Sequence, residues 1–372
     1  MDTAKKSGIS LPRLRLVAME ITRTCPLSCR HCRGDSRNQD YPDELAFDEI
    51  KKILDNIAAF SSPIIIITGG EPLTRPDVFD IARYSTSLGL RTVLATCGRL
   101  LNRDTVRKLI ESGVRRISIS IDGASAAAHD SFRGDPGAFD AALKGIDTAR
   151  SEGLEFQINS TLTTLNIDEL DELHALAVSL GAAGFHPFLL VPMGRGQGLS
   201  DFALSPDAYE SARKKIAGRA ARSPIEIKPT CSPHYSRVYR QTRPGLTGMN
   251  TPLHAGFRPS DQNGHGPVMT RGCLGGQGFA FVSHIGKVQI CGFLDLEAGD
   301  LRRDSYDFRK IWETAPLFLD VRAKENYTGK CGSCEFWNVC GGCRARAFYQ
   351  KGSYLEDEPN CIYQPGESAK QP

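Results

Sequence analysis

Six segments rich in β-branched and apolar residues alternate with six helix-like segments, and this alternation constrains the fold more than any other feature. The strand-like segments cover residues 13–22, 63–68, 91–96, 115–121, 155–163 and 184–191. Nearly continuous apolar runs are typical of strands that are covered on both faces. The alternation predicts a parallel sheet with right-handed crossovers. The period alone does not separate an open doubly wound sheet from a partial barrel.

The helix-like segments carry recognisable end signals. They cover residues 48–60, 77–88, 103–112, 138–152, 168–180 and 206–221. Gly113, Gly153 and Gly181 stand where helix C-caps are expected. Ser205 before Pro206 is a good N-cap, because Pro is favoured at the first helical position. We therefore expect six βα units from residue 13 to 222.

Three cysteines, Cys25, Cys29 and Cys32, fall within eight residues directly after the first predicted strand. Such a loop can place three thiolates on one face of an iron–sulfur cluster, and three ligands would leave one of four irons open for a substrate. A zinc site is an alternative, but zinc prefers four N or S ligands, so His31 would have to join. Three unrelated thiols are the remaining alternative. The spacing favours the cluster.

The spacing Cys25-x3-Cys29-x2-Cys32, with His31 in the place of a usually aromatic residue, resembles the signature of the radical S-adenosylmethionine (SAM) enzymes. The resemblance implies a [4Fe–4S] cluster whose open iron binds SAM. It further implies that one-electron reduction cleaves SAM to a 5′-deoxyadenosyl radical, which abstracts a substrate hydrogen. Between the two sheet architectures, the resemblance selects the curved, TIM-like partial (β/α)6 barrel of an α/β protein.

Unusual residues follow several predicted strands, and chemistry in parallel α/β sheets gathers at these C-terminal strand ends. The loop Gly69-Gly70-Glu71-Pro72 resembles the family's GGEP motif, which implies that it holds the SAM amino group; a plain turn is the alternative. Two glycines permit close backbone approach, and a carboxylate accepts from an ammonium. By the same resemblance, further SAM contacts would come from Ser120 and Asp122 (ribose), Arg133 (carboxylate), and Asn159 and Val191 (adenine).

Cys97 follows the third predicted strand, where relatives often carry Thr-Asn-Gly. We interpret it as a packed thiol without a role in a cluster.

The C-terminal third carries most of the remaining thiols. Pairs of CxxC are usual in zinc ribbons, but the arrangement from residue 273 to 361 resembles the SPASM domain, which binds auxiliary iron–sulfur clusters. The resemblance implies an outer cluster on Cys331, Cys334, Cys340 and Cys361 and an inner one on Cys273, Cys291 and Cys343. Relatives commonly have three residues where Cys340 and Cys343 are separated by two. One or two clusters therefore remain possible, and the fourth inner ligand could be Cys231, another residue or none.

Residues 223–272 break the pattern, and from residue 232 onward they show no clear periodicity. The cations here are Arg237, Arg240, Arg243, Arg258, Arg271, His234, His254 and His265, against the single acid Asp261. One interpretation is a solvated linker; the other is a lid that clamps an acidic substrate through Arg–carboxylate pairs. The predicted organisation is thus a barrel at 13–222, a basic linker or lid at 223–272 and a SPASM domain at 273–363.

Composition excludes several classes of protein. The 46 Lys and Arg nearly balance the 43 Asp and Glu, so the net charge gives no case for nucleic acid. The N-terminus has no apolar h-region, and the longest apolar runs are too short to span a bilayer. Twelve Cys in such a chain favour metal or redox chemistry over disulfides. We expect a cytoplasmic protein without a membrane span.

Five further segments narrow the resemblance to the haem synthases of the siroheme-dependent haem pathway: residues 19–24, 191–196, 230–235, 272–279 and 340–347. This resemblance implies an oxidative decarboxylase whose substrate is a tetracarboxylate porphyrin. Two propionates of iron-coproporphyrin III would become vinyl groups, giving haem b. The electron donor would be a low-potential protein such as ferredoxin or flavodoxin.

Two rival functions remain. One is a SPASM-type maturase of a ribosomal peptide. Such enzymes often carry an N-terminal peptide-binding domain, and the dozen residues before the first strand are too few to fold into one. The other is a non-enzymatic iron–sulfur electron carrier, in which the loop at 69–72 and the SAM-facing residues would be idle.

Overall fold

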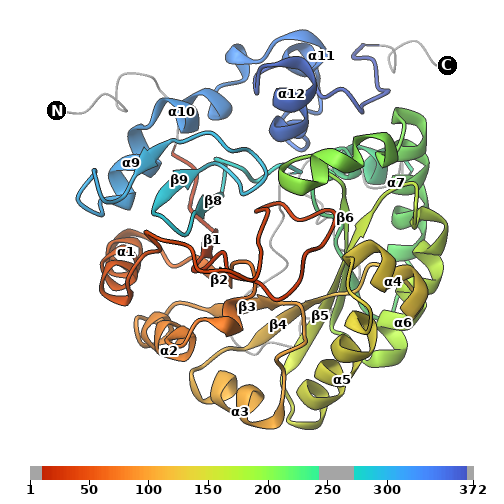
Figure 1. Cartoon of the computed structure of the whole chain (residues 1–372). Helices are drawn as coiled ribbons and strands as arrows, with labels where there is room; N and C mark the ends of the chain where they lie inside the picture. Colours follow the sequence, from red (N-terminus) through yellow and green to blue (C-terminus); the bar gives the residue numbers. More distant parts are fainter. Residues whose placement is uncertain (1–10, 243–271, 367–372) are drawn as a thin grey trace.

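The structure, a computed structural model, describes residues 11–242 and 272–366. Within these ranges one ten-stranded sheet runs through the protein in the order β10-β9-β8-β1-β2-β3-β4-β5-β6-β7. Figure 1 shows this sheet curving inside a ring of helices, with the C-terminal region at one end. Because β10 and β7 are free edges, the sheet is an open, partial barrel.

The six predicted strands are confirmed, and each runs parallel to its neighbour in chain order. Their bounds are β1 Leu16–Glu20, β2 Ile64–Thr68, β3 Thr92–Thr96, β4 Arg116–Ser120, β5 Glu155–Leu162 and β6 Gly184–Leu189. A short strand, β7 (Glu226–Ile227), extends the parallel series beyond β6. Parallel pairing in chain order places all six C-terminal strand ends along one rim.

The six predicted helices are confirmed and cover the outside of the sheet (Figure 1). They are α1 Phe47–Phe60, α2 Val78–Ser87, α3 Arg103–Glu111, α5 Ala138–Ser151, α6 Leu170–Leu180 and α7 Pro206–Ala220. In α1 the buried residues Ile50, Ile53, Leu54 and Ile57 follow helical spacing, which gives one apolar stripe toward the sheet. Ser205 caps α7 as expected, because its Oγ accepts from the N–H of Ala208 at 3.2 Å.

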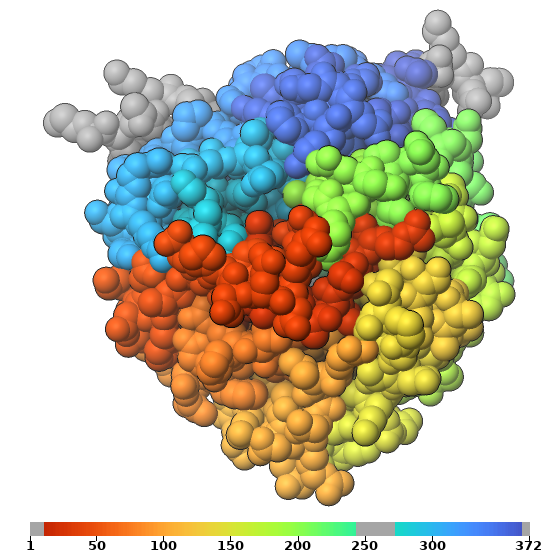
Figure 2. Space-filling model, in the orientation of Figure 1, coloured from red at the N-terminus to blue at the C-terminus, as the bar shows by residue number. Residues whose placement is uncertain are grey.

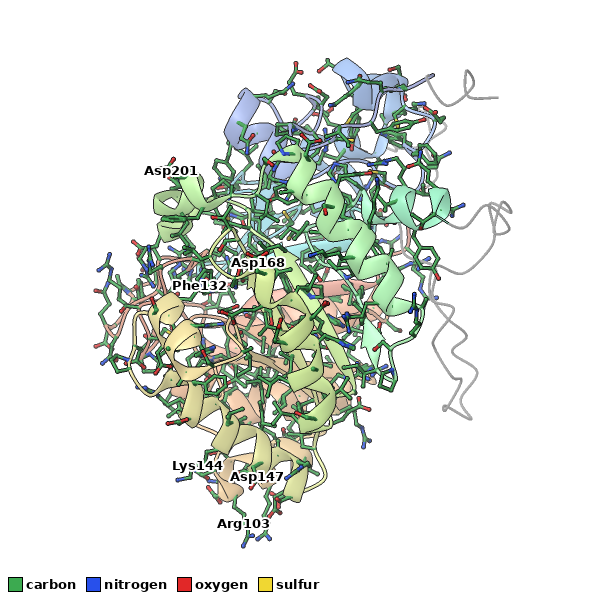
Figure 3. All side chains as sticks on the ribbon, turned by 90° about the vertical axis from the view of Figure 1, so that its right-hand side faces the viewer. Arg103, Phe132, Lys144, Asp147, Asp168 and Asp201 are labelled. Atoms are coloured by element: carbon green, nitrogen blue, oxygen red, sulfur yellow. The ribbon has the colours of Figure 1, made fainter. Side chains whose placement is uncertain are left out.

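Solvent-exposed charges mark the outer side of these helices. Arg103, Lys144 and Asp147 are exposed, and Figure 3 shows them at the end of the molecule farthest from the C-terminal region. Helix α4 (Ala126–Arg133), capped by Ser125, was not predicted. Its eight residues are too few to show a clear helical period. Short 3-10 turns, η2 Pro72–Thr74, η3 Ile167–Glu169 and η4 Gly194–Phe202, complete this half.

The C-terminal region continues the barrel sheet. Strand β8 (Phe279–Val282) pairs parallel to β1, and β9 (Lys287–Gln289) and β10 (Gly299–Asp300) follow in antiparallel order. Beyond them, α9 Phe308–Thr314, α10 Pro316–Arg322, η6 Lys324–Asn326, α11 Gly329–Ser333 and α12 Arg344–Lys351 form the cap at the end of the molecule. Strand β8 therefore joins the C-terminal region to the barrel sheet, and the domain boundary at residue 273 stays a prediction.

In the first part of residues 223–272 the chain is packed rather than solvated, and the choice between a linker and a lid stays a prediction. Helix α8 (Tyr235–Gln241) follows β7 and is packed, with Tyr235, Arg237 and Val238 buried. The Arg237 guanidinium bonds both carboxylate oxygens of Glu210, at 2.9 and 2.7 Å, and His234 is 1% exposed. Both side chains are therefore internal, and burial lowers the pKa of His234 well below its ordinary value. The predictions for Arg243, Arg258, Arg271, His254, His265 and Asp261 lie outside the described residues.

None of the helices in residues 11–242 and 272–366 has the length and apolar character needed to cross a membrane.

Candidate functional site

A cavity of about 210 Å³ opens at the C-terminal rim of the sheet. Alternate residues of neighbouring strands line it, Ser118 and Ser120 from β4 and Asn159 and Thr161 from β5, because successive side chains of a strand point to opposite faces. In Figure 2 the N-terminal segment that carries the first three cysteines crosses this side of the molecule, between the barrel helices and the C-terminal region.

Cys25, Cys29 and Cys32 all line this cavity. Two N–H donors approach their sulfurs: Ser36 N lies 3.4 Å from Cys32 Sγ, and Arg133 Nη1 lies 3.5 Å from Cys29 Sγ. Such donors stabilise thiolates that hold an iron–sulfur cluster. Burial raises the pKa of Cys25 to about 12 and also raises that of Cys29. Binding of a cluster would therefore release protons from these thiols.

The loop at 69–72 packs directly against the residues that lead into Cys25. Its backbone bonds join Gly70 N to Thr22 O at 2.8 Å and Glu71 N to Thr24 O at 2.9 Å. A Cβ at Gly69 would lie 2.4 Å from Thr22 O, and one at Gly70 2.5 Å from Arg23 O. Glycine is thus required here because two backbone segments approach closely. The close contact between these backbone segments is one reason for glycine at both positions. The predicted close approach of the loop backbone to a ligand is the other.

The Glu71 side chain is fully buried just behind the cavity wall. Both of its oxygens accept from Thr96 Oγ1 at 2.9 Å, and backbone N–H groups of Cys97 and Leu73 add bonds of 2.7 and 3.2 Å. Burial raises the pKa of Glu71 in spite of these donors. Pro72, the first residue of η2, is also buried. Contact between Glu71 and the SAM ammonium stays a prediction.

Asp122 and Arg133 form a buried ion pair beside the three-cysteine loop, with Oδ2 and Nη2 2.6 Å apart. The other oxygen of Asp122 accepts from Thr161 N at 2.6 Å. Burial alone would raise the pKa of Asp122, but the Arg133 charge, followed by His31, holds it below its ordinary value. The His31 ring stacks on Phe132 with 4.6 Å between centroids; Figure 3 labels Phe132. Arg133 is thus already paired, and its role toward the SAM carboxylate stays a prediction.

The structure brings most of the predicted SAM-site residues into one cavity. Its lining includes Gly69, Gly70, Ser120, Arg133, Asn159 and Val191 together with the three cysteines. Asp122 and Glu71 are buried and bonded to residues of that lining or next to it. Cys97 was predicted to be a packed thiol. It lines the cavity and packs against the buried side chains of Cys25, Leu27 and Cys29.

Sequence reasoning missed several residues of the cavity, among them Arg33, Arg195, Phe188 and Phe293. Arg195 and Phe188 could have been found, because they lie at or just after the end of the sixth predicted strand, where functional residues are expected. Phe293 gave no signal, since it comes from the distant C-terminal region. It lies two residues after Cys291, so the cavity wall includes the chain segment that carries one of the predicted inner thiols.

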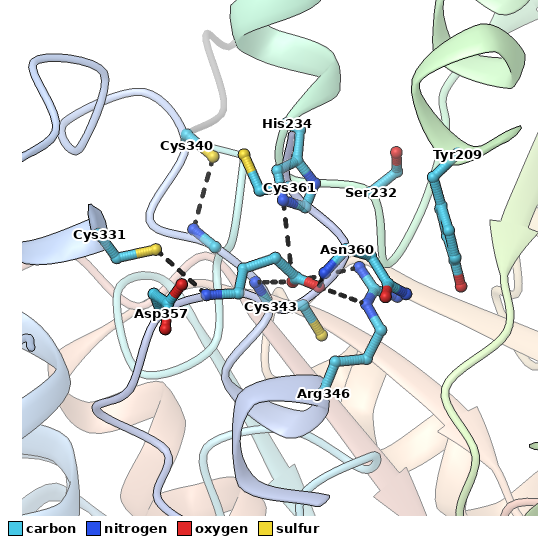
Figure 4. Close-up of polar contacts among 12 residues, drawn as sticks. Tyr209, Ser232, His234, Cys331, Cys340, Cys343, Arg346, Asp357, Asn360 and Cys361 are labelled. Carbon is cyan, nitrogen blue, oxygen red and sulfur yellow. Dashed lines mark hydrogen bonds and ion pairs between the residues drawn. The ribbon is translucent and has the colours of Figure 1, made fainter. Parts of the chain in front are cut away.

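The predicted outer set of thiols lies around a second cavity. Cys331, Cys334, Cys340 and Cys361 line it, together with His234 and Arg237 from the end of the barrel. Backbone N–H groups again approach the sulfurs: Glu358 N lies 3.4 Å from Cys331 Sγ, and Gly342 N lies 3.5 Å from Cys340 Sγ. Figure 4 shows these contacts. The donors fit a cluster held by the four thiolates.

Cys231 is the candidate for the fourth ligand of the inner set. Burial raises the pKa of Cys231 well above its ordinary value, the charges of Cys343, Cys291 and Cys273 raise it further, and Arg346 lowers it. Its membership of the inner set stays a prediction. In the described ranges, no three Cys, His, Asp or Glu side chains converge on a point where a single metal ion could sit. The three-cysteine loop and the outer set line cavities instead, which leaves room there for groups of several atoms.

The chain is similar to proteins of known family. Residues 19–177 match the model of the radical SAM superfamily. The "AdoMet-dependent heme synthase" of Methanosarcina barkeri is 47% identical over 95% of this chain and 97% of its own length, and that of Nitratidesulfovibrio vulgaris is 43% identical over 95% and 94%. In fold, the chain resembles Streptococcus suis SuiB bound to S-adenosylmethionine, with a TM-score of 0.70, 18% identity and coverage of 96% of this chain and 79% of SuiB.

Proposed function

Because this chain belongs to the radical SAM superfamily and to the family of the AdoMet-dependent heme synthases, we propose that it oxidatively decarboxylates iron-coproporphyrin III to haem b. One observation carries the proposal furthest. A single cavity is lined by the three-cysteine loop and by Phe293, next to the inner set of thiols. A substrate in this cavity would lie between the source of the radical and an acceptor for the released electron.

The residues fit the cofactors that the family requires. Cys25, Cys29 and Cys32 would hold a [4Fe–4S] cluster, and the outer and inner sets of thiols would hold two auxiliary clusters. With SAM bound, these groups would supply the radical that removes a β-hydrogen from a propionate, after which loss of CO2 and one electron leaves a vinyl group. The protein contributes binding, orientation and exclusion of water.

We assign the SAM contacts to the residues at the cavity. The loop of Gly69, Gly70, Glu71 and Pro72 would receive the amino group, and Ser120 and Asp122 would lie by the ribose. Arg133 would face the carboxylate, and Asn159 and Val191 the adenine. Most of these residues line the cavity that contains the three thiols.

Apolar side chains of β6 and the following loop complete the cavity, with Phe188, Leu189 and Leu190 in its lining. A flat porphyrin ring would pack against such a wall. All twelve cysteines are free thiols, which suits a reducing compartment. We therefore place the enzyme in the cytoplasm, with a low-potential donor such as ferredoxin or flavodoxin.

The decisive experiment is an anaerobic assay with iron-coproporphyrin III, SAM and a reductant, analysed by mass spectrometry. We expect two successive losses of one CO2 and two hydrogens from the porphyrin, with formation of 5′-deoxyadenosine. Unchanged porphyrin beside active SAM cleavage would point to a peptide maturase instead. Absence of 5′-deoxyadenosine from protein with a full iron content would point to an electron carrier.

A further inference from the structure

The cavity at the three-cysteine loop, called the SAM cavity below, is lined by several arginines. In the sequence analysis, the cations for an acidic substrate were expected from residues 232–272 instead. Three arginines, Arg33, Arg133 and Arg195, belong to the lining, and it contains no Asp or Glu among the described residues. Each arginine is paired with a carboxylate outside the lining, namely Glu20, Asp122 and Asp35 respectively, so a ligand can use only the donors that these pairs leave over. The three arginines differ in how far the protein already uses their donors.

Two of the three are committed to protein partners. Arg133 is paired with the buried Asp122 at 2.6 Å. Arg33 is paired with the buried Glu20 at 3.2 Å and donates to Gly292 O at 3.3 Å. Its guanidinium also lies 4.5 Å from the centroid of the Phe281 ring. Both charges are therefore paired with a buried carboxylate. Arg133 also keeps its Nε buried without a hydrogen-bond partner among the described residues, which is consistent with the SAM contact assigned to it above.

Arg195 is held firmly and yet keeps one donor free. Its backbone N–H donates to Cys32 O at 3.1 Å, and its Nε donates to Cys29 O at 2.9 Å. Nη1 donates to Ser36 O and to the half-exposed Asp35, both at 2.7 Å. Nη2, by contrast, is buried and has no hydrogen-bond partner among the described residues.

The backbone fixes this arrangement. Gly194, directly before Arg195, has φ +53°, and a Cβ on it would lie 2.2 Å from Arg33 O. The loop after β6 therefore presses against the three-cysteine loop, and the Arg195 side chain cannot move away without losing several bonds. A donor that is buried and unpaired in a native site costs free energy, so a ligand that accepts from it gains affinity.

We propose that Arg195 binds a carboxylate through Nη2, either a propionate of the porphyrin or the carboxylate of SAM. A carboxylate suits this donor because charge-assisted hydrogen bonds to guanidinium are strong. The propionate alternative rests on the function proposed above, and the SAM alternative does not. In both cases Arg195 would connect the ligand to the backbone near the three-cysteine loop, because its side chain also donates to Cys29 O and Ser36 O.

The test compares Arg195→Gln, Arg195→Lys and a control, Arg116→Gln. Arg116 is also a half-buried, ion-paired arginine, but it lies at the start of β4, at the opposite end of the strand from the cavity. Binding of iron-coproporphyrin III and of its tetramethyl ester is measured by Soret titration of reconstituted protein, in the same detergent. SAM binding is measured separately by equilibrium dialysis without porphyrin.

A propionate contact predicts that Arg195→Gln weakens binding of the acid tenfold or more and leaves the ester and SAM unchanged. A SAM contact predicts a similar loss for SAM alone. Arg195→Lys keeps the positive charge, so its loss of ligand affinity should be smaller. If Arg195→Gln loses iron, Arg195→Lys takes its place in the comparison. Equal losses for acid and ester would show a structural role, and no loss for any ligand would also overturn the proposal. If wild-type protein binds no porphyrin, the proposed function fails, while the SAM measurement still tests Arg195.

Discussion

The guanidinium of Arg346 and the carboxylate of Glu358 form an ion pair at 2.9 Å in which neither side chain is exposed to solvent. The pair links both sets of C-terminal thiols. Glu358 accepts from Cys343 N at 2.7 Å, and its own N–H lies 3.4 Å from Cys331 Sγ, while Arg346 donates to Cys231 O at 2.7 Å. Figure 4 labels Arg346, Cys343 and Cys331 in this region. The geometry of the inner and outer sets thus depends on one buried pair.

Glu358→Gln should strongly destabilise the protein. The amide keeps the size and a hydrogen-bond acceptor but leaves the Arg346 charge buried without compensation, which costs about 3–5 kcal/mol. The measurement is denaturant unfolding of anaerobically reconstituted protein. Glu297→Gln is the control, because Glu297 also pairs with cations but is 35% exposed, and it should cost less than about 1 kcal/mol. Similar losses for both variants would contradict the assigned role.

Arg237→Met should reduce stability without a specific effect on porphyrin binding. The change leaves the Glu210 carboxylate, which is 5% exposed, without its bidentate partner, at a cost of about 3 kcal/mol or more. Unfolding measurements should show this loss, whereas Soret titration of the folded fraction should give wild-type affinity. A stable variant with weakened porphyrin binding would return Arg237 to the role of a substrate ligand.

Local patterns in the sequence predicted most of the barrel and the grouping of the thiols. The repeat of apolar residues every 2 or 3.6 positions and the residues that cap helices are set by near neighbours in the chain. These local signals were therefore enough to locate β1–β6 and six helices. The spacing of cysteines similarly depends on short loops. Cys331, Cys334 and Cys340 indeed line one cavity, as their spacing indicated.

Contacts between distant parts of the chain could not be predicted. Pairing of β8 with β1, for example of Phe279 with Leu16, leaves no mark in either strand alone. Composition made α8 look like a solvated segment, because the acid that neutralises Arg237 lies 27 residues away in α7. Counting charges within a window misses such a partner.

Cys231→Ala should remove iron from the inner set of thiols only. We predict that it belongs to the inner set with Cys273, Cys291 and Cys343, and loss of one of four thiolates weakens a cluster. We expect iron and sulfide to fall by up to one cluster per chain. Cys97→Ala is the matched control, since Cys97 was predicted to have no cluster role, and it should keep full iron content. Wild-type iron content in the Cys231 variant would exclude it as a ligand.

Glu20→Gln should change how stability depends on pH. Glu20 is buried in β1, and although burial alone would raise its pKa, Arg33, His284 and Arg23 lower it to about 2. A group whose pKa is lower in the folded state stabilises the protein fully above its ordinary pKa of 4.5 and progressively less as pH falls toward 2. The shift corresponds to a contribution on the order of 3 kcal/mol at neutral pH.

The measurement is the difference in unfolding free energy between wild type and Glu20→Gln, followed from pH 7 downward. Acid loss of iron–sulfur clusters affects both proteins alike, so the difference isolates the carboxylate. We expect a constant difference on the order of 3 kcal/mol above about pH 5 and a decrease below it, because protonated Glu20 and Gln are both neutral. A difference that stays constant down to pH 3 would mean that Glu20 has the same pKa in the folded and the unfolded protein. A difference that grows in favour of wild type as the pH falls would mean that Glu20 is neutral in the folded protein at neutral pH. Arg33, at the wall of the SAM cavity, would then carry an unpaired charge and become a second candidate for a carboxylate ligand.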